Sequence, residues 1–363
     1  MSFLNSLLER ALPKEHYRRY RRCRNWKSHA ARIDKAITQF VGKRQQIGAQ
    51  QWRLWQKKLA RAYVRDDWYP EEYFFFRYER LSRKGIHSFV GQREANLFWN
   101  FMNPREAYLL TCDKGATYSR FARYFQRDLV AVSREDSSSG PAFVRLSEKH
   151  SRLIVKPTFG NFGNAVLVVE TADVMDKQAL LDSLLDDYPG GFVAEQLIEQ
   201  HAALSALHPA SVNTVRLSTV RLKNGEIYVI HRPFLRVGQG GNCVDNGAKG
   251  GIIASIDHDT GIIYAAIDER MNRYVVHPDT QEPIVGFRIP RWEEAKQLAV
   301  ELAGVLPELG YCGWDLALTE KGWVMVEANG KGLFIGFQMP AQEGFREEFE
   351  YIKKQCGYGN EEV

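Results

Sequence analysis

Two acidic residues and an asparagine near the C-terminal end of the sequence have the types and spacing of a metal site. The stretch GYCGWDLALTEKGWVMVEANGKG, residues 310–332, has the pattern of two strands joined by a turn. A turn centred on Lys321 places Asp315 opposite Glu327, and directly opposed residues of a hairpin point to the same face. Asn329 returns to that face two residues later.

Two adjacent carboxylates repel each other unless a cation neutralises them. Carboxylate and carboxamide oxygens suit Mg²⁺ or Mn²⁺, and a magnesium ion with few protein ligands usually takes nucleotide phosphates as the others. We therefore predict a metal site at Asp315, Glu327 and Asn329, with a solvated hairpin as the alternative. The same register predicts that the alternate positions face the core: Leu316, Leu318, Val324 and Val326.

A glycine-rich loop lies between two predicted strands in SRLIVKPTFGNFGNAVLVVE, residues 151–170. Lys156 ends the first strand, and Gly160 and Gly163 lie in the loop. Glycines let backbone N–H groups approach a phosphate, and a lysine supplies a positive charge. No GK[ST] closes the loop and no helix follows it, so neither a Walker A motif nor a Rossmann turn is indicated. An ordinary β-hairpin is the alternative.

Two arginines lie on adjacent predicted β-segments, Arg216 in NTVR and Arg236 in FLRVG. Alternate residues of a strand face one side, so both side chains are expected to project into one cleft. An arginine fork suits a transferring phosphoryl group or an acylphosphate, whereas a surface ion pair is the alternative for each residue.

A second glycine-rich loop, VDNGAKGG, offers three polar residues to the edge of such a site and is a candidate mobile lid: Asp245, Asn246 and Lys249. His277, in VVHPDTQ, either contacts the substrate or has a structural role in its turn.

The elements that must position these residues form an α+β pattern. Short β-rich runs follow residue 110 without regular alternation of strand and helix, which argues against a doubly wound sheet. Asn224-Gly225 marks a hairpin turn, QALLDSLLDDY and RWEEAKQLAVELAGVLPEL are predicted helices, and GGFVAEQLIEQH contains a strand. Residues 66–110 are rich in aromatic residues and predict short helices.

Composition and charge set the N-terminal segment apart. The chain has 363 residues and a net charge of +5, but residues 1–65 carry seventeen Lys or Arg against three acids, so this segment is +14. Its amphipathic start and its mixture of arginines with aromatic residues suit a helical cap on the main domain, an anionic membrane or polymer, or nucleic acid. Without a named nucleic-acid motif, the last is the weakest alternative.

The remaining composition is that of an ordinary globular protein. The five cysteines are scattered without CxxC pairs, and no long apolar run or secretory leader is present. We therefore expect reduced cysteines and a cytoplasmic protein. The basic segment indicates an alternative location, peripheral at the inner face of the membrane.

Taken in order, these motifs resemble the ATP-grasp superfamily over about residues 105–340, and within it the sugar-transfer-associated ATP-grasp proteins. The chain is also similar to α-L-glutamate ligase-like proteins. Lys114, in CDKG, and Lys156, in IVKP, resemble the two phosphate-binding lysines, and Gly160 to Gly163 resembles the mobile loop over the phosphates. The segments SVNTVRLSTV and HRPFLRVGQGGNCVDNGAKGG resemble signatures of the sugar-transfer-associated family.

FVAEQLIEQ resembles the family's hinge, which implies adenine contacts for four residues and ribose contact for Glu199; the four are Glu195, Gln196, Leu197 and Ile198. D-x(11)-E-x-N, here Asp315, Glu327 and Asn329, resembles the magnesium ligands.

This resemblance implies an ATP-grasp fold in four parts. These are a basic helical region over 1–105, an N-terminal lobe over 106–198, a C-terminal lobe over 199–345 and a tail over 346–363. The chain differs from many members of the superfamily at its N-terminal end. Those members carry an α/β domain before the lobes, whereas this chain carries the basic helical region. Which part of the chain binds the second substrate is therefore not indicated by the resemblance.

The resemblance also implies an ATP- and Mg²⁺-dependent ligase that joins a carboxylate to an amine through an acylphosphate. The substrate expected is an amino acid or a sugar acid of cell-surface polysaccharide synthesis. A sugar or polyol kinase and a nucleotide-binding scaffold are the alternatives, and the sequence does not indicate the oligomeric state.

Overall fold

The computed structural model describes residues 19, 29–160, 165–240 and 250–359. The chain forms two compact units, and each is described by itself. One unit comprises Met1–Leu97 with Leu333–Tyr351, and the other comprises Phe98–Gly332 with Ile352–Val363. The boundaries predicted at 105, 198 and 345 stay predictions.

The first unit is helical, as the sequence predicted. Its aromatic and aliphatic residues recur at three- and four-residue spacing, so each helix has one apolar side. On α3, for example, Ile33, Ala36 and Ile37 are buried against Trp52 and Leu59 of α4. The helices that lie wholly or partly in this unit are α3 (Ala30–Phe40), α4 (Arg44–Asp66), α5 (Pro70–Phe75), η2 (Tyr78–Arg80), α6 (Arg83–Ser88), α7 (Gln92–Met102), α14 (Ile335–Gln338) and α15 (Arg346–Gln355).

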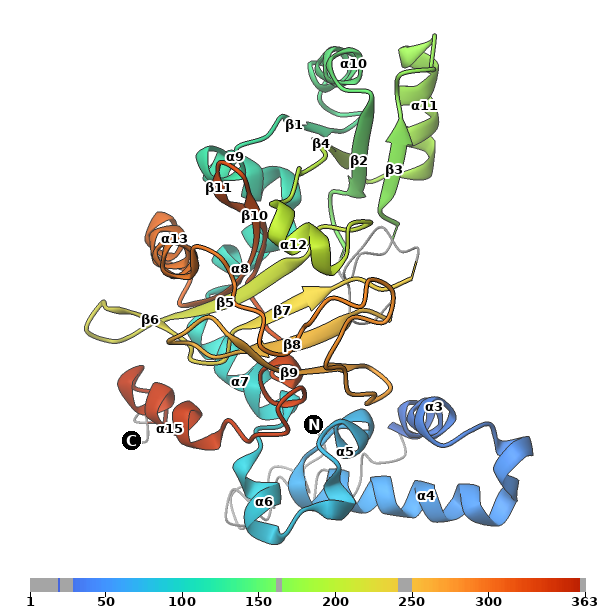
Figure 1. Ribbon diagram of the computed structural model, residues 1–363, viewed down its shortest axis with the longest axis vertical. Helices are drawn as coiled ribbons and strands as arrows, with labels where there is room; N and C mark the ends of the chain where they lie inside the picture. The colour runs from blue at the N-terminus through green and yellow to red at the C-terminus, as the bar shows by residue number, and fades with distance from the viewer. Residues whose placement is uncertain (1–18, 20–28, 161–164, 241–249, 360–363) are drawn as a thin grey trace, which may run out of the picture. The chain divides into compact units, whose positions relative to one another are not determined.

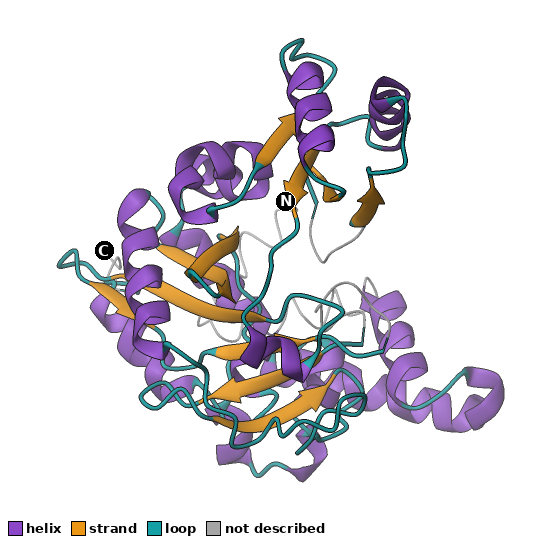
Figure 2. Cartoon of the chain, turned by 45° about the horizontal axis from the view of Figure 1, so that its top comes forward, coloured by secondary structure: helices purple, strands orange, loops and turns teal. Residues whose placement is uncertain are grey.

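The second unit contains two antiparallel sheets, which Figures 1 and 2 show as separate groups of strands. The smaller sheet has the strand order β1-β4-β2-β3. Helices α10 (Ser139–Lys149) and α11 (Lys177–Asp187) place Phe143, Leu146 and Leu184 in its core. The strands of this sheet are β1 (Leu129–Val132), β2 (Arg152–Pro157), β3 (Leu167–Glu170) and β4 (Phe192–Gln196).

The larger sheet has the order β11-β10-β5-β7-β8-β9, with β6 paired to β5. Four helices bury apolar residues in the core that this sheet shares: α8 (Arg105–Cys112), α9 (Lys114–Phe125), α12 (Ala202–Leu207) and α13 (Trp292–Val305). Its strands are β5 (Thr214–Arg221), β6 (Ile227–Val229), β7 (Phe234–Val237), β8 (Ile252–Ile256), β9 (Ile263–Asp268), β10 (Tyr311–Thr319) and β11 (Gly322–Asn329).

The hairpin of β10 and β11 has the predicted register at one end only. Asp315 is paired with Glu327, as predicted, but Thr319 is paired with Gly322 and Leu316 with Met325. The turn is therefore one residue tighter than a turn centred on Lys321. A β-bulge at Val326, the residue without a partner, restores the register at the carboxylates.

The bulge corrects the predicted core positions of β11. Leu316 and Leu318 do join the main core, but their partners there are Trp323 and Met325. Val324 is buried as predicted, at 3% exposure, but the shifted pairing turns it to the opposite face of the hairpin, and the unpaired Val326 is only half-buried. One extra residue in a strand exchanges the two faces, so a register that is right at one end of a hairpin is wrong at the other.

Candidate active site

Asp315 lies at the centre of a buried ion-pair cluster. Its side chain has no exposed surface, and both of its oxygens accept hydrogen bonds from Arg216, at 2.5 Å from Nε and 2.8 Å from Nη2. Nη2 of Arg236 lies 2.7 Å from Oδ2, and the Asn329 amide donates to the same oxygen at 3.3 Å. Burial alone would raise the pKa of Asp315, but the two guanidinium groups hold it below its usual value.

The strand register explains why both arginines reach one carboxylate. β5 lies between β10 and β7, with Arg216 paired to Asp315 and Thr214 paired to Arg236. Positions 214 and 216 share a face of the sheet, so the two side chains meet as the sequence predicted. The Thr214 hydroxyl accepts from Nε and Nη2 of Arg236, which fixes the orientation of that guanidinium group.

Glu327 is the less neutralised member of the carboxylate pair. Within the described residues its one ion pair is with Lys114, at 3.8 Å between Oε1 and Nζ. Burial and then the adjacent charge of Asp315 raise the pKa of Glu327, while Lys114 and Lys156 act in the opposite direction. Burial also lowers the pKa of Lys114. The charged forms of Lys114 and Glu327 are therefore both disfavoured by loss of hydration. A further cation beside Glu327 would stabilise its charged form.

The three predicted metal ligands fit a magnesium ion by the chemistry of their donors. Asp315 and Glu327 supply carboxylate oxygens. The Asn329 amide points its nitrogen toward Asp315, and no described residue donates to its oxygen, which leaves that oxygen for a cation. Among the described residues there is no group of three His, Cys, Asp or Glu that holds a metal ion alone. Such an ion would therefore need phosphate or water oxygens to complete its coordination.

Lys114 contacts the start of the glycine-rich loop. It begins α9, where the Asp113 side chain caps the helix by accepting from Ala116 N at 3.0 Å. Lys114 Nζ donates to the Gly160 carbonyl at 2.9 Å, and Phe159 forms a bridge with Asp113. The lysine next to Glu327 is thus tied to the loop that follows β2.

Gly160→Ala is expected to lower nucleotide affinity severalfold with little loss of overall stability. Gly160 has φ +147°, which a residue with a Cβ adopts only at a cost of about 1–3 kcal/mol. Relaxation of this strain displaces the carbonyl that Lys114 contacts. The measurement is ATP affinity by calorimetry, with Gly190→Ala as the control because open space surrounds that glycine. Equal ATP affinity of the two variants would contradict the role of Gly160.

Lys156, the second predicted phosphate lysine, is positioned by Glu195. The two residues lie on neighbouring strands β2 and β4, and Lys156 Nζ is 3.0 Å from Oε1 of Glu195. Oε2 of Glu195 accepts from Nε and Nη2 of Arg127, at 2.9 and 2.6 Å. Burial opposes the charge, but Lys156 and then Arg127 lower the pKa of Glu195 to about 2.

The sequence had offered no motif for Arg127, which connects the two sheets. Its Nη1 donates to the carbonyl of Met325 on β11 at 2.7 Å, and the same nitrogen donates to Phe125 O at 3.2 Å. One guanidinium group therefore joins the carboxylate that holds Lys156 to the strand that carries Glu327. The one sequence signal for a buried Arg127 was its position between an apolar helix and an apolar strand.

The predicted hinge is an extended connection between the sheets. β4 ends at Gln196, residues 197–199 follow, and Gln200 forms a bridge with Thr319 of β10. Within the described chain, no hydrogen bond satisfies the backbone groups of 197–199, so these groups are available to a ligand. Gln196 accepts from Asp128 N and donates its own N–H to Asp128 O, whereas Glu199 is exposed.

Of the five remaining predicted residues, only His277 belongs to the described part of the chain. Gly163, Asp245, Asn246 and Lys249 fall outside the described residues. His277 is fully buried, its Nε2 is 2.8 Å from the Gly238 carbonyl, and its Nδ1 accepts from Asp279 N and Thr280 N. Both ring nitrogens are therefore used by the backbone, which supports the structural alternative for this histidine over substrate contact.

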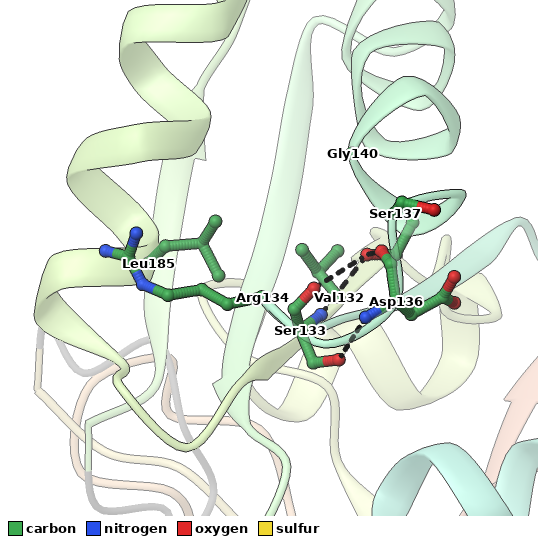
Figure 3. A pocket seen from close by; sticks show the side chains of 8 residues that line it. Val132, Ser133, Arg134, Asp136, Ser137, Gly140 and Leu185 are labelled. Atoms are coloured by element: carbon green, nitrogen blue, oxygen red, sulfur yellow. Dashed lines mark hydrogen bonds between the residues drawn. The ribbon is translucent and has the colours of Figure 1, made fainter.

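A pocket of about 290 Å³ lies beside the first turn of α10, and Figure 3 shows the side chains that line it. Its wall includes Ser133, Asp136 and Ser139, and the Ser139 hydroxyl donates to the carbonyls of the other two. None of the predicted site residues lines it. Its hydroxyl and carbonyl groups bond to one another, so we do not assign it to the candidate site.

A search among family models decides the identity of the fold. The model described as sugar-transfer-associated ATP-grasp matches residues 93–354, which include every described residue of the site. The chain belongs to this family. Its two antiparallel sheets are thus the ATP-grasp lobes, and the cofactors of this sugar-transfer-associated ATP-grasp protein are ATP and Mg²⁺ or Mn²⁺.

Solved structures show distant likeness to this ATP-grasp chain. D-alanine–D-alanine ligase from Bacillus anthracis is 13% identical with a TM-score of 0.40, covering 68% of this chain and 67% of that one. The corresponding enzyme from Helicobacter pylori is 16% identical with a TM-score of 0.42, covering 73% and 66%. The ATP-grasp ligase PsnB, complexed with minimal precursor, is 13% identical with a TM-score of 0.41, covering 70% and 63%.

The chain therefore spans about two thirds of the length of each of these proteins. No curated protein matches it.

Proposed function

We propose that this ATP-grasp protein is a ligase that joins a carboxylate to an amine and releases ADP. The observation that carries the proposal is a charged cluster in which Lys114 lies 3.8 Å from Glu327, Lys156 lies 3.0 Å from Glu195, and two arginines hold Asp315. Such a site neutralises the charge of a triphosphate and of the phosphate that is transferred from it. Positioning and charge neutralisation suffice for phosphoryl transfer, so no nucleophilic side chain is needed.

The proposed reaction has two displacements. An oxygen of the substrate carboxylate attacks the γ-phosphorus of ATP while the bond to the β-phosphate oxygen breaks, which gives an acylphosphate and ADP. The amine then attacks the acyl carbon, inorganic phosphate leaves, and the amine proton is released. In this scheme Glu195 and the backbone of residues 196–198 receive adenine, and Glu199 receives the ribose. Lys114, Lys156 and the loop at Gly160 receive the phosphates.

Arg216 and Arg236 have two roles in this proposal. Both hold Asp315, and they carry positive charge at the side of the site where the transferred phosphate would lie. Asp315, Glu327 and Asn329 would hold the magnesium ion, which supplies Lewis-acid polarisation of phosphate oxygens when bound. Asp245, Asn246 and Lys249 remain predicted substrate contacts.

The proposed substrate is an amino acid or a sugar acid used for cell-surface polysaccharide. This part is supported by the family description, which associates these ATP-grasp proteins with sugar transfer. A small-molecule carboxylate and a small-molecule amine are thus the expected partners.

The direct test is a screen for ATP-dependent ADP release over amino acids and uronic acids, offered singly and in pairs. The ligase predicts release that needs a carboxylate and an amine together. Glu327→Gln keeps the size of the side chain but removes a metal-ligand charge, so we expect ADP release to fall at least a hundredfold. Full activity of this variant with Mg²⁺ would show that the metal assignment is wrong.

Two other results would favour other functions. ADP release with a sugar or polyol alone would identify a kinase acting on a hydroxyl. A Lys156→Ala variant that no longer binds ATP but keeps its cellular role would identify a nucleotide-binding scaffold of a polysaccharide-synthesis complex. A peripheral contact of residues 1–65 with an anionic membrane or polymer also stays a prediction. Among the described residues, no helix is both long and apolar enough to cross a membrane.

A further inference from the structure

Helix α4 in the first unit has a basic side that its neighbours leave exposed. Arg53, Lys57 and Arg61 follow one another at four-residue spacing and are all exposed. Leu54 lies beside them with 44% of its surface exposed. We call these four residues the α4 basic face.

The opposite side of α4 is the one that packs. Trp52, Leu59 and Ala62 are buried in the core that α3 and α5 complete, and Figure 1 shows these two helices lying along α4. The α4 basic face is therefore turned away from the core of its own unit.

The three cations of this face have no ion pair within the described residues. Other cations of the helix are neutralised: Lys58 lies 2.6 Å from Glu79, and Arg65 contacts Asp66 and Tyr78. No acid occurs anywhere in residues 42–65, which carry seven Lys or Arg. Uncompensated like charge on one helical side is unfavourable by itself and becomes favourable against an anionic surface.

We propose that the α4 basic face docks on an anionic lipid bilayer. The cations from Arg53 to Arg61 span about 12 Å along a straight helix, so a flat surface meets all three at once. Leu54 between them supplies an apolar side chain for the boundary of headgroups and acyl chains, as in helices that lie in a membrane interface.

A bilayer suits this face better than single-stranded nucleic acid does. Binding of single strands relies on exposed aromatic side chains for stacking. On α4, Trp52 and Tyr63 are buried and Trp55 packs against Phe74, so none of them belongs to the basic face. The inference concerns the unit that lacks the ATP site residues, and it stands or falls independently of the proposed ligase activity.

The test is partition of the full-length protein onto vesicles, measured by co-sedimentation. One set of vesicles is phosphatidylcholine alone, and the other contains about one third phosphatidylglycerol. We expect binding to the second set only, with affinity that falls as salt is raised. The triple variant Arg53→Gln, Lys57→Gln, Arg61→Gln should lose about 100-fold in partition, since a cation near an anionic leaflet contributes about fivefold. Leu54→Gln should cause a smaller loss that salt does not change.

A matched control removes the same net charge from exposed positions of the other unit: Arg145→Gln, Lys223→Gln and Arg273→Gln. Circular dichroism verifies that each variant is folded, and ADP release from ATP in solution should be unchanged in both. Partition of the α4 variant equal to the wild type would overturn the proposal, as would equal losses in the control. Binding of the wild type to an oligonucleotide but not to anionic vesicles would assign the face to nucleic acid instead.

Discussion

Asp315→Asn is expected to lower the free energy of unfolding by about 3–5 kcal/mol and to abolish ADP release. The change removes the carboxylate that neutralises the buried guanidinium group of Arg216 and the half-buried one of Arg236. Removal of one member of a buried ion pair costs this much because the remaining charges stay desolvated. Urea denaturation measures the first effect, and the ADP-release screen measures the second.

A second buried aspartate separates stability from function. Asp268 accepts from two backbone N–H groups and from Tyr274 and Asn272, and it lies outside the site. Asp268→Asn should destabilise the protein but preserve the stabilisation that MgATP gives on binding. A double variant, Arg216→Met with Asp315→Asn, should regain part of the lost stability and remain inactive. If Asp315→Asn unfolds like the wild type, the buried cluster does not stabilise the fold.

Glu195→Gln is expected to lower the free energy of unfolding by ~3 kcal/mol at neutral pH and to raise the KM for ATP by at least tenfold. This loss of stability follows from the pKa of Glu195, which is about 2 in the folded chain against an ordinary value of 4.5. The KM should rise because Lys156 loses the charge that orients it. A rise in KM with an unchanged kcat would mark ground-state binding of the phosphates.

The pH dependence of this effect has a definite sign. The carboxylate binds a proton more readily when unfolded, so its stabilisation is complete above pH 4.5 and is lost as the pH falls toward 2. The difference between wild type and Glu195→Gln should therefore shrink over that interval. Glu170→Gln, which breaks an exposed pair with Arg152, should change stability by less than ~1 kcal/mol at any pH. A Glu195 effect that is constant with pH would show that the carboxylate is not held by charge.

The sequence was sufficient for elements whose signals are local. Asn224-Gly225 does join two paired strands, with Gly225 at φ +88°, because the turn residues alone determine that geometry. The alternation around Arg216 and Arg236 likewise predicted two side chains on one face of adjacent strands. For the metal hairpin, the pairing of Asp315 with Glu327 was predicted correctly although the turn was assigned one residue too wide.

Interactions between distant segments were beyond the sequence. Arg127 is isolated between a helix and a strand, and its importance comes from Glu195, 68 residues later, and from Met325, 198 residues later. The sequence predicted the two arginines as contacts of a phosphoryl group, which stays a prediction, but it did not predict that both donate to Asp315. The acceptor that a guanidinium group contacts depends on how the strands pair, and the alternation of residues along one strand does not determine that pairing.

The unpaired Val326 also changes what the spacing of the predicted metal ligands means. Without that residue the tight turn would continue in regular pairing, and the glutamate would still lie opposite Asp315, with the asparagine still opposite Gly313. Ten residues between the aspartate and the glutamate would thus give the same pairing that eleven give here. The strand would be less twisted, because a bulge adds local twist. A sequence pattern for this site should therefore allow either ten or eleven residues between the two carboxylates. A pattern of fixed length would miss proteins whose strand lacks the bulge.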